Sequence, residues 1–321
     1  MIFSTHPLHP AVTADLQALG RLCIASAPTA QAISAECAGA ELIVVRAPIP
    51  LGVAARQAGL RALIRHGAGL DMINLDEATA AGVLVANVPG ANALTVAEHV
   101  VWTAMALLRR NPQVTRDLRG AGWAAARAHA DDGRELSGRR LGILGFGNIG
   151  RTLARIAQRG FGMPVIAHTR SGTSEDGVTA VTFADLLAGA DVLALCAPLT
   201  DATRGMINAA ALAQMKPGAV LINVARGPLV DEQALIAALA SGHLGGAALD
   251  VFDTQPLPAD HPFLALPNLI LTPHMAGITD ESMLRMGQGV VAEARRILAG
   301  DLPANLVNPA AVARYQSRFP R

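Results

Sequence analysis

Short apolar runs alternate with longer segments of helical periodicity along most of the chain. In the first part, up to about residue 90, the apolar runs are short enough for strands, and alanine-rich segments separate them. The predicted strands are 22–25, 42–45, 62–64 and 83–86, and the helical segments include 11–19 and 51–57. Alternation of strands and helices predicts a parallel sheet that is covered on both faces.

The alternation becomes regular from residue 141 onward. Six predicted strands cover residues 141–144, 165–168, 192–196, 220–224, 247–251 and 269–271. Predicted helices between them include 152–158, 183–188, 209–214 and 232–240. This pattern predicts a second, doubly wound parallel sheet of the kind that binds dinucleotides. A long helix over about 280–299 is expected to return the chain to the first part, because the tail beyond it is too short to fold alone.

Two helical segments connect these parts. Residues 95–108 are apolar nearly all round, which predicts a buried or interface helix. Thr95 and Glu98 have the spacing of a capping box at its start, and we interpret the lone His99 as structural rather than catalytic. Residues 111–135 are more polar, which favours a helical excursion toward a second subunit.

The strand at 141–144 runs directly into Gly145-Phe146-Gly147-Asn148-Ile149-Gly150 and then into a helix. In such a motif the first glycine makes the turn, the second lets backbone N–H groups approach a pyrophosphate, and the third lets helix and strand pack closely. The phosphates then lie at the positive end of the helix. The flanking strand and helix favour a dinucleotide site over a glycine-rich turn without a ligand. The predicted cofactor contacts here are Gly145, Gly147, Asn148, Ile149 and Gly150.

Composition and charge exclude several function classes. The 321 residues, long enough for two domains, include 26 basic and 25 acidic ones, so no basic field favours nucleic acid or an anionic membrane. The three cysteines have no metal or redox spacing, which fits a reducing cytoplasm. The sequence contains no apolar run of membrane-spanning length and no signal-peptide pattern at Met1. We expect a cytoplasmic protein without a metal site and without nucleic-acid or membrane partners.

Polar residues of the second part gather where its strands end. Arg170, Arg226, Asp250 and His274 follow four different predicted strands. Because the carboxyl ends of parallel strands share one edge, where such sheets bind ligands, these residues are site candidates. In the first part, Gly67-Ala68-Gly69 closely follows the strand at 62–64 and offers backbone N–H groups at a similar edge. Solvated loops and an ordinary tight turn are the alternatives for each of these taken alone.

Six segments, spread in order over nearly the whole chain, carry a family resemblance. They are 65–71 (RHGAGLD), 96–99 (VAEH), the Gly145 motif, 223–227 (NVARG), 248–252 (ALDVF) and 271–274 (LTPH). With these motifs the chain resembles the D-2-hydroxyacid dehydrogenases, which include phosphoglycerate dehydrogenase, glyoxylate/hydroxypyruvate reductase and formate dehydrogenase. The resemblance implies an α/β protein of two doubly wound domains. A Rossmann cofactor domain, 98–282, would be inserted into a flavodoxin-like substrate domain formed by 1–97 and 283–321.

The resemblance also implies roles for individual residues. Arg226 would hold the carboxylate and carbonyl oxygen of the substrate, since a guanidinium fork fits a planar carboxylate in a bidentate manner. His274 would protonate the carbonyl oxygen as hydride arrives, and accept the proton in reverse. Gly67-Ala68-Gly69 would donate N–H groups to the carboxylate, and Asp250 would accept from the nicotinamide carboxamide.

Further positions match the family less specifically. Arg46 corresponds to a basic position near the substrate, although an exposed structural role is an equal alternative. Ala225 and Gly277, together with Arg226 and His274, lie in segments that border the cofactor in the family.

Gln255 departs from the family pattern. Most relatives carry a glutamate there, which pairs with the catalytic histidine. A carboxylate beside an imidazole raises its pKa, and a neutral amide does so far less. We therefore expect His274 to titrate lower than in glutamate-bearing relatives, so that carbonyl reduction fades at a lower pH.

A second departure concerns the cofactor. NAD-binding relatives carry an aspartate about 20 residues after the glycines, which binds the ribose 2′-hydroxyl. Here that position is Thr169, followed by Arg170. A 2′-phosphate is then not repelled, and Arg170 can pair with it. We predict NADP(H) as the cofactor, with NAD(H) as the alternative.

The sequence therefore favours an NADP(H)-dependent reductase of small 2-keto acids, such as glyoxylate or hydroxypyruvate, that gives the D-2-hydroxy acid. One alternative is an NAD-dependent enzyme like phosphoglycerate dehydrogenase. Less favoured are an enzyme like formate dehydrogenase, in which glutamine also replaces the glutamate, and a corepressor-like protein that binds a dinucleotide without catalysis. Relatives are commonly homodimers joined through the helix near 96–108, so we expect a homodimer.

Overall fold

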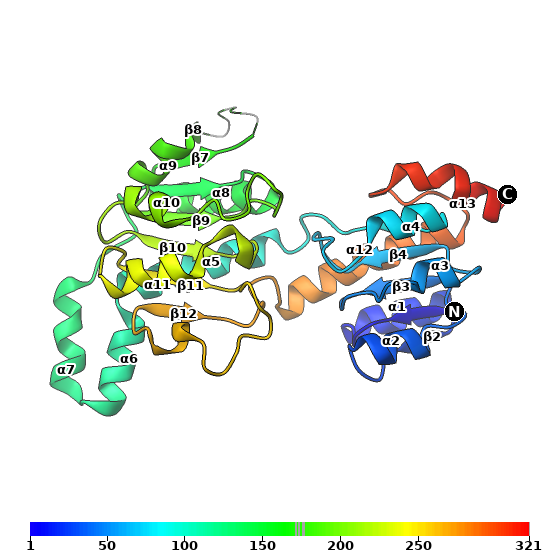
Figure 1. Ribbon diagram of the computed structural model, residues 1–321, viewed down its shortest axis with the longest axis horizontal. Helices are drawn as coiled ribbons and strands as arrows, with labels where there is room; N and C mark the ends of the chain where they lie inside the picture. The colour runs from blue at the N-terminus through cyan, green and yellow to red at the C-terminus, as the bar shows by residue number, and fades with distance from the viewer. Residues whose placement is uncertain (171, 173, 175–176, 321) are drawn as a thin grey trace. The chain divides into compact units, whose positions relative to one another are not determined.

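The computed structural model describes residues 1–321 except 171, 173, 175, 176 and 321. The chain divides into two compact units. Unit 1 comprises Met1–Asn92 and Ile278–Arg321, and unit 2 comprises Ala93–Gly277. Each unit contains one parallel sheet with helices on its faces (Figure 1), which confirms the predicted α/β class.

The sheet of unit 1 has five strands in the order β2-β1-β3-β4-β5. This is the flavodoxin-like order, whose topological switch point lies between β1 and β3. The strands are β1 (Ile2–Ser4), β2 (Leu22–Ile24), β3 (Leu42–Val45), β4 (Ala62–Arg65) and β5 (Leu84–Ala86). The hydrophobic pattern misses β1, because its three residues at the chain end form too short an apolar run. β1 is nevertheless central, since it pairs with both β2 and β3.

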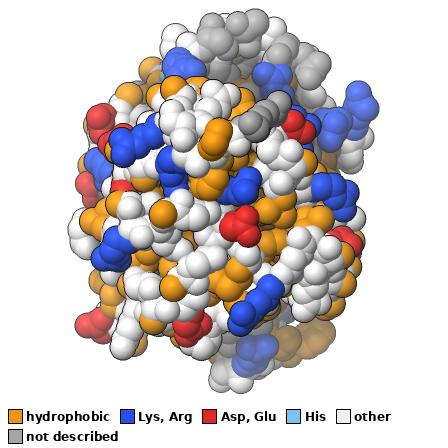
Figure 2. All heavy atoms as spheres, turned by 90° about the vertical axis from the view of Figure 1, so that its right-hand side faces the viewer, with side chains coloured by type: hydrophobic (Ala, Val, Ile, Leu, Met, Phe, Trp, Pro, Cys, Tyr) orange, Lys and Arg blue, Asp and Glu red, His pale blue; other side chains and the backbone are white. Residues whose placement is uncertain are grey.

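Helices cover both faces of this sheet. Apolar side chains of one face, such as Val44 and Ile64, pack with Val12, Ala294 and Tyr315 of the covering helices. Those helices are α1 (Pro10–Leu19), α12 (Asp280–Leu298) and α13 (Val312–Arg318), and the opposite face carries α2 (Ala30–Glu36), α3 (Val53–Arg56) and α4 (Leu75–Ala81). Basic and acidic side chains are interspersed with hydrophobic ones over the face in Figure 2, as the balanced composition leads one to expect.

The sheet of unit 2 has seven strands in the order β12-β11-β10-β9-β6-β7-β8. Counted from β6, this is the Rossmann order 3-2-1-4-5-6 with one added strand, and its switch point lies between β6 and β9. The strands are β6 (Leu141–Leu144), β7 (Val165–His168), β8 (Thr179–Ala180), β9 (Val192–Leu195), β10 (Val220–Asn223), β11 (Gly246–Leu249) and β12 (Leu269–Leu271). β8 is not predicted from the sequence, because its two residues carry no apolar pattern.

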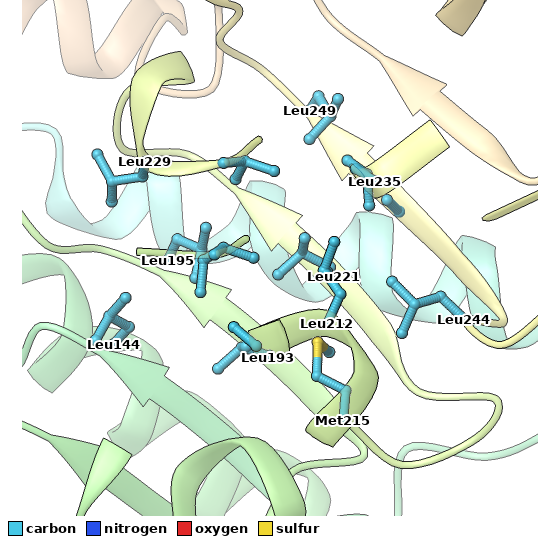
Figure 3. Packing of buried hydrophobic residues seen from close by; sticks show 14 of the residues in the cluster. Leu144, Leu193, Leu195, Leu212, Met215, Leu221, Leu229, Leu235, Leu244 and Leu249 are labelled. Carbon is cyan, nitrogen blue, oxygen red and sulfur yellow. The ribbon is translucent and has the colours of Figure 1, made fainter. Parts of the chain in front are cut away.

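Alternating strand residues of unit 2 face two different layers of helices. On one face, Ile143 and Ile222 pack with α5 (Ala93–Leu108) and α8 (Asn148–Phe161). On the other face, leucines from strands and helices interlock (Figure 3), including Leu195, Leu221 and Leu235. The helices of that face are α9 (Phe183–Gly189), α10 (Ala209–Gln214) and α11 (Glu232–Ala240). Burial on both faces explains why these strands read as continuous apolar runs.

A helical excursion leaves the sheet of unit 2 after α5, as predicted. It consists of α6 (Asn111–Gly120), α7 (Trp123–Ala128) and the 3₁₀ turn η1 (His129–Asp132), and the two helices run side by side (Figure 1). The His129 Nε2 atom lies 2.7 Å from Oδ2 of Asp117, which ties the two helices together. Further 3₁₀ turns are η2 (Gly227–Leu229), η3 (Pro262–Ala265) and η4 (Pro309–Ala311).

The predicted capping box at Thr95 and Glu98 is wrong. α5 begins at Ala93, so Thr95 lies inside the helix and is buried. A capping box does occur at α12, where the Thr279 hydroxyl accepts from the Ser282 N–H and the Ser282 hydroxyl accepts from the Thr279 N–H. Among the residues that the structure describes, no helix is long and apolar enough to cross a membrane.

Candidate active site

The glycine turn after β6 is closed toward the protein and open on its outer side. Gly145 has a φ of +92°, and a Cβ there would lie 2.6 Å from the Ala197 backbone. A Cβ at Gly150 would lie 2.6 Å from the Gly145 carbonyl oxygen, so α8 approaches the turn too closely for a side chain. Gly147 is exposed, and a Cβ there would meet no atom within 4 Å. The structure therefore leaves space at Gly147 for an approaching ligand.

The N-terminus of α8 suits an anionic group. No side chain caps the helix at Gly147, and its first turn contains no acidic residue. The backbone N–H groups of Asn148, Ile149 and Gly150 therefore point outward at the positive end of a helix of 14 residues. The guanidinium of Arg151 lies over the Phe146 ring, 5.1 Å from its centroid, and adds positive charge to this turn. These residues fit a dinucleotide pyrophosphate.

Thr169 and Arg170 follow β7, the neighbour of β6. The Thr169 hydroxyl oxygen accepts from the Gly172 N–H at 3.0 Å, which fixes the turn after the strand. Arg170 is exposed. The carboxyl ends of β6 and β7 thus bring the glycine turn and Arg170 to one edge of the sheet.

Arg226 lies on a loop that a buried asparagine organises. Asn223 ends β10 and is 1% exposed. Its Oδ1 accepts from the Ala225 N–H at 3.0 Å, and its Nδ2 donates to the Arg226 carbonyl at 2.9 Å. A Cβ at Gly227 would lie 2.0 Å from the Phe252 carbonyl carbon, so only glycine lets the two loops meet. Asn223 was not predicted as a site residue, although its polar side chain at the end of an apolar strand was a readable signal.

Asp250 is buried, and its carboxylate holds the loop that carries His274. One oxygen accepts from the Thr272 hydroxyl at 2.6 Å and from the Met275 N–H at 2.8 Å, and the other accepts from the Ala276 N–H at 2.9 Å. The His274 N–H also donates to the Asp250 carbonyl at 2.8 Å. Asp250 therefore holds the Thr272 side chain before His274 and the backbone of Met275 and Ala276 after it.

His274 itself has a φ of +54°, in the left-handed region that residues other than glycine adopt rarely. Its side chain is exposed, and its Nδ1 lies 3.1 Å from Oε1 of Gln255. The Gln255 Nε2 donates to the Phe252 carbonyl at 3.3 Å, which orients the amide with its oxygen toward the histidine. Since an amide oxygen only accepts, Nδ1 carries a proton and Nε2 is the nitrogen that gains or loses one.

Glu232, at the start of α11, holds both ends of the segment that contains Gln255. Its Oε1 accepts from the Asp253 N–H at 3.0 Å, and its Oε2 lies 3.3 Å from the His261 Nε2. The His261 Nδ1 accepts from the Phe263 N–H at 3.3 Å, so the proton of the neutral imidazole is on Nε2 and points to Glu232. The sequence gives no signal for this pairing, because the partners are brought together only by the packing of α11 on the loop.

His99 lies beside this network. Its Nε2 is 3.5 Å from the Thr272 hydroxyl, which in turn donates to Asp250. Burial lowers the pKa of His99, and the nearby Asp250 carboxylate opposes this effect. A neutral His99 therefore supports the Asp250 loop, in line with its interpretation as a structural residue.

The predicted substrate residues of unit 1 follow β3 and β4. Arg46 directly follows β3, and Gly67-Ala68-Gly69 lies one residue after β4, with a φ of +126° at Gly67. The Arg65 guanidinium donates to the carbonyls of Gly69 and His66, at 2.9 and 2.6 Å, and thereby shapes the glycine loop. The Ala68 carbonyl accepts from the Asn87 side chain at 2.9 Å.

Unit 2 brings most of the predicted residues to one sheet edge. Because β10, β11 and β12 are neighbours, Arg226, Asp250 and His274 follow three adjacent strands. Gly277 is the last residue of this unit. Among the described residues, no group of three or more His, Cys, Asp or Glu side chains could hold a metal ion.

Comparison with known proteins decides the family. A family model described as "D-isomer specific 2-hydroxyacid dehydrogenase, NAD binding domain" matches residues 101–276. The chain belongs to the D-isomer specific 2-hydroxyacid dehydrogenases. This confirms the resemblance drawn from the motifs.

Members of this family match the chain over most of its length. The (S)-sulfolactate dehydrogenase of Chromohalobacter salexigens is 42% identical over 81% of this chain and 85% of that protein. The D-3-phosphoglycerate dehydrogenase of Methanocaldococcus jannaschii is 35% identical over 96% of this chain and 59% of that protein. The solved structure of an NADPH-dependent glyoxylate/hydroxypyruvate reductase from Sinorhizobium meliloti is 29% identical, with a TM-score of 0.84, and covers 96% of this chain and 98% of that chain. The chain spans about half the length of the phosphoglycerate dehydrogenases it matches.

Proposed function

We propose that this D-2-hydroxyacid dehydrogenase is an NADP(H)-dependent reductase of small 2-keto acids, such as glyoxylate or hydroxypyruvate. The observation that carries the proposal is the arrangement of Arg226, Asp250 and His274 after three adjacent strands of one sheet, in the unit that holds the glycine turn. Reduction of a keto acid needs two groups from the protein: a cation that binds the carboxylate and an imidazole that exchanges a proton.

In the proposed reaction Arg226 binds the carboxylate and the carbonyl oxygen, which polarises the carbonyl group. His274 gives the proton on Nε2 to the carbonyl oxygen, because its Nδ1 is engaged by Gln255. Asp250 keeps His274 in this orientation through its contacts with the loop. The bound nicotinamide would supply the hydride. In unit 1, the N–H groups of Gly67-Ala68-Gly69 would donate to the substrate carboxylate.

The cofactor proposal rests on Thr169 and Arg170. A carboxylate after β7 would repel a 2′-phosphate and accept from a 2′-hydroxyl. Thr169 carries no negative charge, and its hydroxyl oxygen already accepts from the Gly172 N–H. Arg170 is exposed at the same edge and offers a guanidinium to the phosphate. The Sinorhizobium meliloti relative is described as NADPH-dependent, which is compatible with the proposal, while the family model is named for NAD.

The similarity to phosphoglycerate dehydrogenases makes an NAD-dependent oxidation of a phosphorylated hydroxy acid the second candidate. Steady-state rates distinguish these functions. Reduction of glyoxylate, hydroxypyruvate and phosphohydroxypyruvate is measured with NADPH and with NADH, and oxidation of formate is measured with NADP⁺ and with NAD⁺. The proposal expects the highest kcat/KM with a small keto acid and NADPH. Turnover of formate, or of phosphohydroxypyruvate with NADH alone, would overturn it.

A further inference from the structure

A cavity of about 350 Å³ opens on unit 1, between α3, α4 and α13. Its lining includes Gln57 and Ala58, which precede β4, and Ala81, which precedes β5. The cavity therefore lies where these strands begin, at the opposite edge of the sheet from Arg46 and Gly67-Ala68-Gly69. A cavity of this size accommodates a small ligand, and the proposed reaction gives it no role.

The cavity lining combines both signs of charge with small apolar groups. Glu77 of α4 carries the negative charge, and Arg314 and Arg318 of α13 carry the positive charges. Apart from Gln57, the rest of the lining consists of alanines, whose small side chains form an apolar wall: Ala54, Ala55, Ala58, Ala80 and Ala81. A ligand that matches this lining carries both charges and a short apolar group.

Arg318 is held in place by backbone carbonyl groups. Its guanidinium donates to carbonyls of the loops before β4 and β5, at 2.8 to 3.2 Å: those of Gln57, Ala58, Leu60, Ala81 and Gly82. Burial and the nearby charge of Arg314 lower the pKa of Arg318. Arg318 thus supplies a fixed positive charge to the cavity, and an anion beside the two guanidinium groups would offset their mutual repulsion.

Glu77 and Arg314 line the same cavity without pairing with each other. The Glu77 Oε1 atom accepts from the Ala55 N–H at 3.2 Å, which holds the carboxylate at the first turn of α4. The stem of Arg314 lies at the other end of α4, against Gly82, where a Cβ would be 2.7 Å from the Arg314 Cγ atom. Among the residues that the structure describes, neither Glu77 nor Arg314 forms an ion pair.

The spacing along α4 suits the two charges of an amino acid. Glu77 and Gly82 are five residues apart, which corresponds to about 7.5 Å along a helix axis. The ammonium nitrogen and a carboxylate oxygen of an amino acid are about 3 Å apart. With a charge-assisted hydrogen bond of about 2.8 Å at each end, such a ligand bridges about 9 Å. A simple anion or a simple amine engages only one end.

We propose that this cavity binds a small α-amino acid with a short apolar side chain. Arg314 binds the carboxylate beside the fixed charge of Arg318, and the ammonium group donates to Glu77. The side chain of the ligand lies on the alanine wall. The site goes beyond the proposed reductase reaction, because neither the keto acid nor the cofactor takes part. Binding to the full chain is therefore measured without substrate or cofactor, and its outcome is independent of the proposed function.

Three ligands of similar shape test the site by isothermal titration calorimetry. They are L-valine, isovalerate, which lacks the ammonium group, and isobutylamine, which lacks the carboxylate. L-Valine should bind at one molecule per chain and at least about tenfold more tightly than either analogue, because each analogue loses a charge-assisted hydrogen bond. An analogue that binds as tightly as L-valine, or the absence of saturable L-valine binding, would overturn the proposal.

Variants then assign the binding to this cavity. Glu77→Gln keeps an oxygen for the Ala55 N–H but removes the charge, so it should weaken L-valine binding about tenfold and leave isovalerate binding unchanged. Arg314→Gln should weaken the binding of both ligands. The control is Asp76→Asn, an exposed change on α4 outside the lining, which should alter neither. Ala80→Phe, which fills the cavity, should abolish binding. Unchanged L-valine affinity in Glu77→Gln and Arg314→Gln would place the bound amino acid elsewhere and reject the site.

Discussion

The Nδ1 atom of His274 lies 3.1 Å from Oε1 of Gln255, an amide oxygen at the position where a carboxylate is expected from the family pattern. The contact keeps the orienting function of the usual pair, because it fixes the tautomer and the direction of the ring. It lacks the negative charge that would stabilise an imidazolium. A glutamate at this position would both orient the His274 ring and raise its pKa. Gln255 orients the ring without adding the charge that raises the pKa.

Replacing Gln255 by glutamate should restore the charge. The carboxylate stabilises protonated His274, so the pKa of the histidine rises and its acid form persists to higher pH. In the Gln255→Glu variant, kcat/KM for glyoxylate reduction should therefore fall at a higher pH than in the wild type. Full pH profiles of both proteins measure this, with the exposed Gln214→Glu as the control. Superimposable profiles would mean that the residue at position 255 does not affect the pKa of His274.

Replacing Thr169 by aspartate should reverse the cofactor preference. The new carboxylate repels a 2′-phosphate and accepts from a 2′-hydroxyl, so kcat/KM with NADPH should fall and that with NADH should rise. We expect the ratio of the two to change by about a hundredfold, as two charge-dependent contacts are altered. The ratio is measured with glyoxylate as the common substrate. Arg170→Gln should lower kcat/KM with NADPH and leave kcat/KM with NADH unchanged. A wild type that prefers NADH would contradict the proposed cofactor.

The carboxylate of Glu232 should matter for turnover although it lies outside the predicted chemistry. Glu232→Ala frees the Asp253 N–H and His261, so the segment with Gln255 is no longer held at either end. We expect kcat/KM to fall about tenfold, corresponding to the loss of hydrogen bonds to a charged group. Glu135→Ala, an exposed change in the same unit, serves as the control. A variant with normal kcat and a normal pH profile would assign Glu232 a purely structural role.

His66 should make unit 1 sensitive to acid. Its pKa is lowered to about 3 in the folded protein, whereas an imidazole in the unfolded chain titrates near 6.5. The unfolded state therefore binds a proton that the folded state does not, and stability falls as the pH drops below about 6.5. Between pH 7 and pH 5 this contribution amounts to about 2 kcal/mol.

The His66→Phe variant lacks this titration and removes an unpartnered polar atom, so it should be at least as stable as the wild type at pH 7 and more stable at pH 5. Denaturant unfolding at both pH values measures the difference. His243→Phe is a contrasting control, because the His243 Nε2 does have a partner, the Leu212 carbonyl at 3.0 Å. A His66→Phe protein that loses stability equally at both pH values would indicate a satisfied structural histidine.

The helical excursion should join two copies of the chain. The Trp123 side chain is 77% exposed and Trp102 is 52% exposed, which is unusual for such large apolar groups. With Leu118 and Met105, also exposed, they offer an apolar surface on α5, α6 and α7. We expect light scattering to give the mass of a homodimer, and Trp123→Arg to shift it toward the monomer. A wild type that is monomeric at micromolar concentration would contradict this proposal.

Much of the fold could be predicted because buried parallel strands consist of consecutive apolar residues. β6 and β10 are examples, and the glycine turn between β6 and α8 carries its own signal. β1 and β8 were missed because such short strands acquire their pairing from neighbours rather than from local pattern. The start of α5 was misplaced because a Thr followed by Glu at the right spacing also occurs inside helices.

Site residues could be predicted from the sequence only where the residue type itself indicates a chemical role. Arg226, Asp250 and His274 could be named because each follows a strand at the ligand edge. Other features could not be predicted, because they arise from packing between distant segments and no local sequence pattern indicates them. Examples are the contact between Glu232 and His261 and the buried His66 Nε2 atom.

The most direct test is the rate of glyoxylate reduction by the purified protein with NADPH, compared with that of His274→Ala. We predict turnover that prefers NADPH over NADH and falls by about a hundredfold to ten-thousandfold in the variant, which is the usual contribution of general acid catalysis. Absence of turnover with both glyoxylate and hydroxypyruvate, with either cofactor, would contradict the proposed reaction. Equal rates for wild type and His274→Ala would contradict the proposed mechanism.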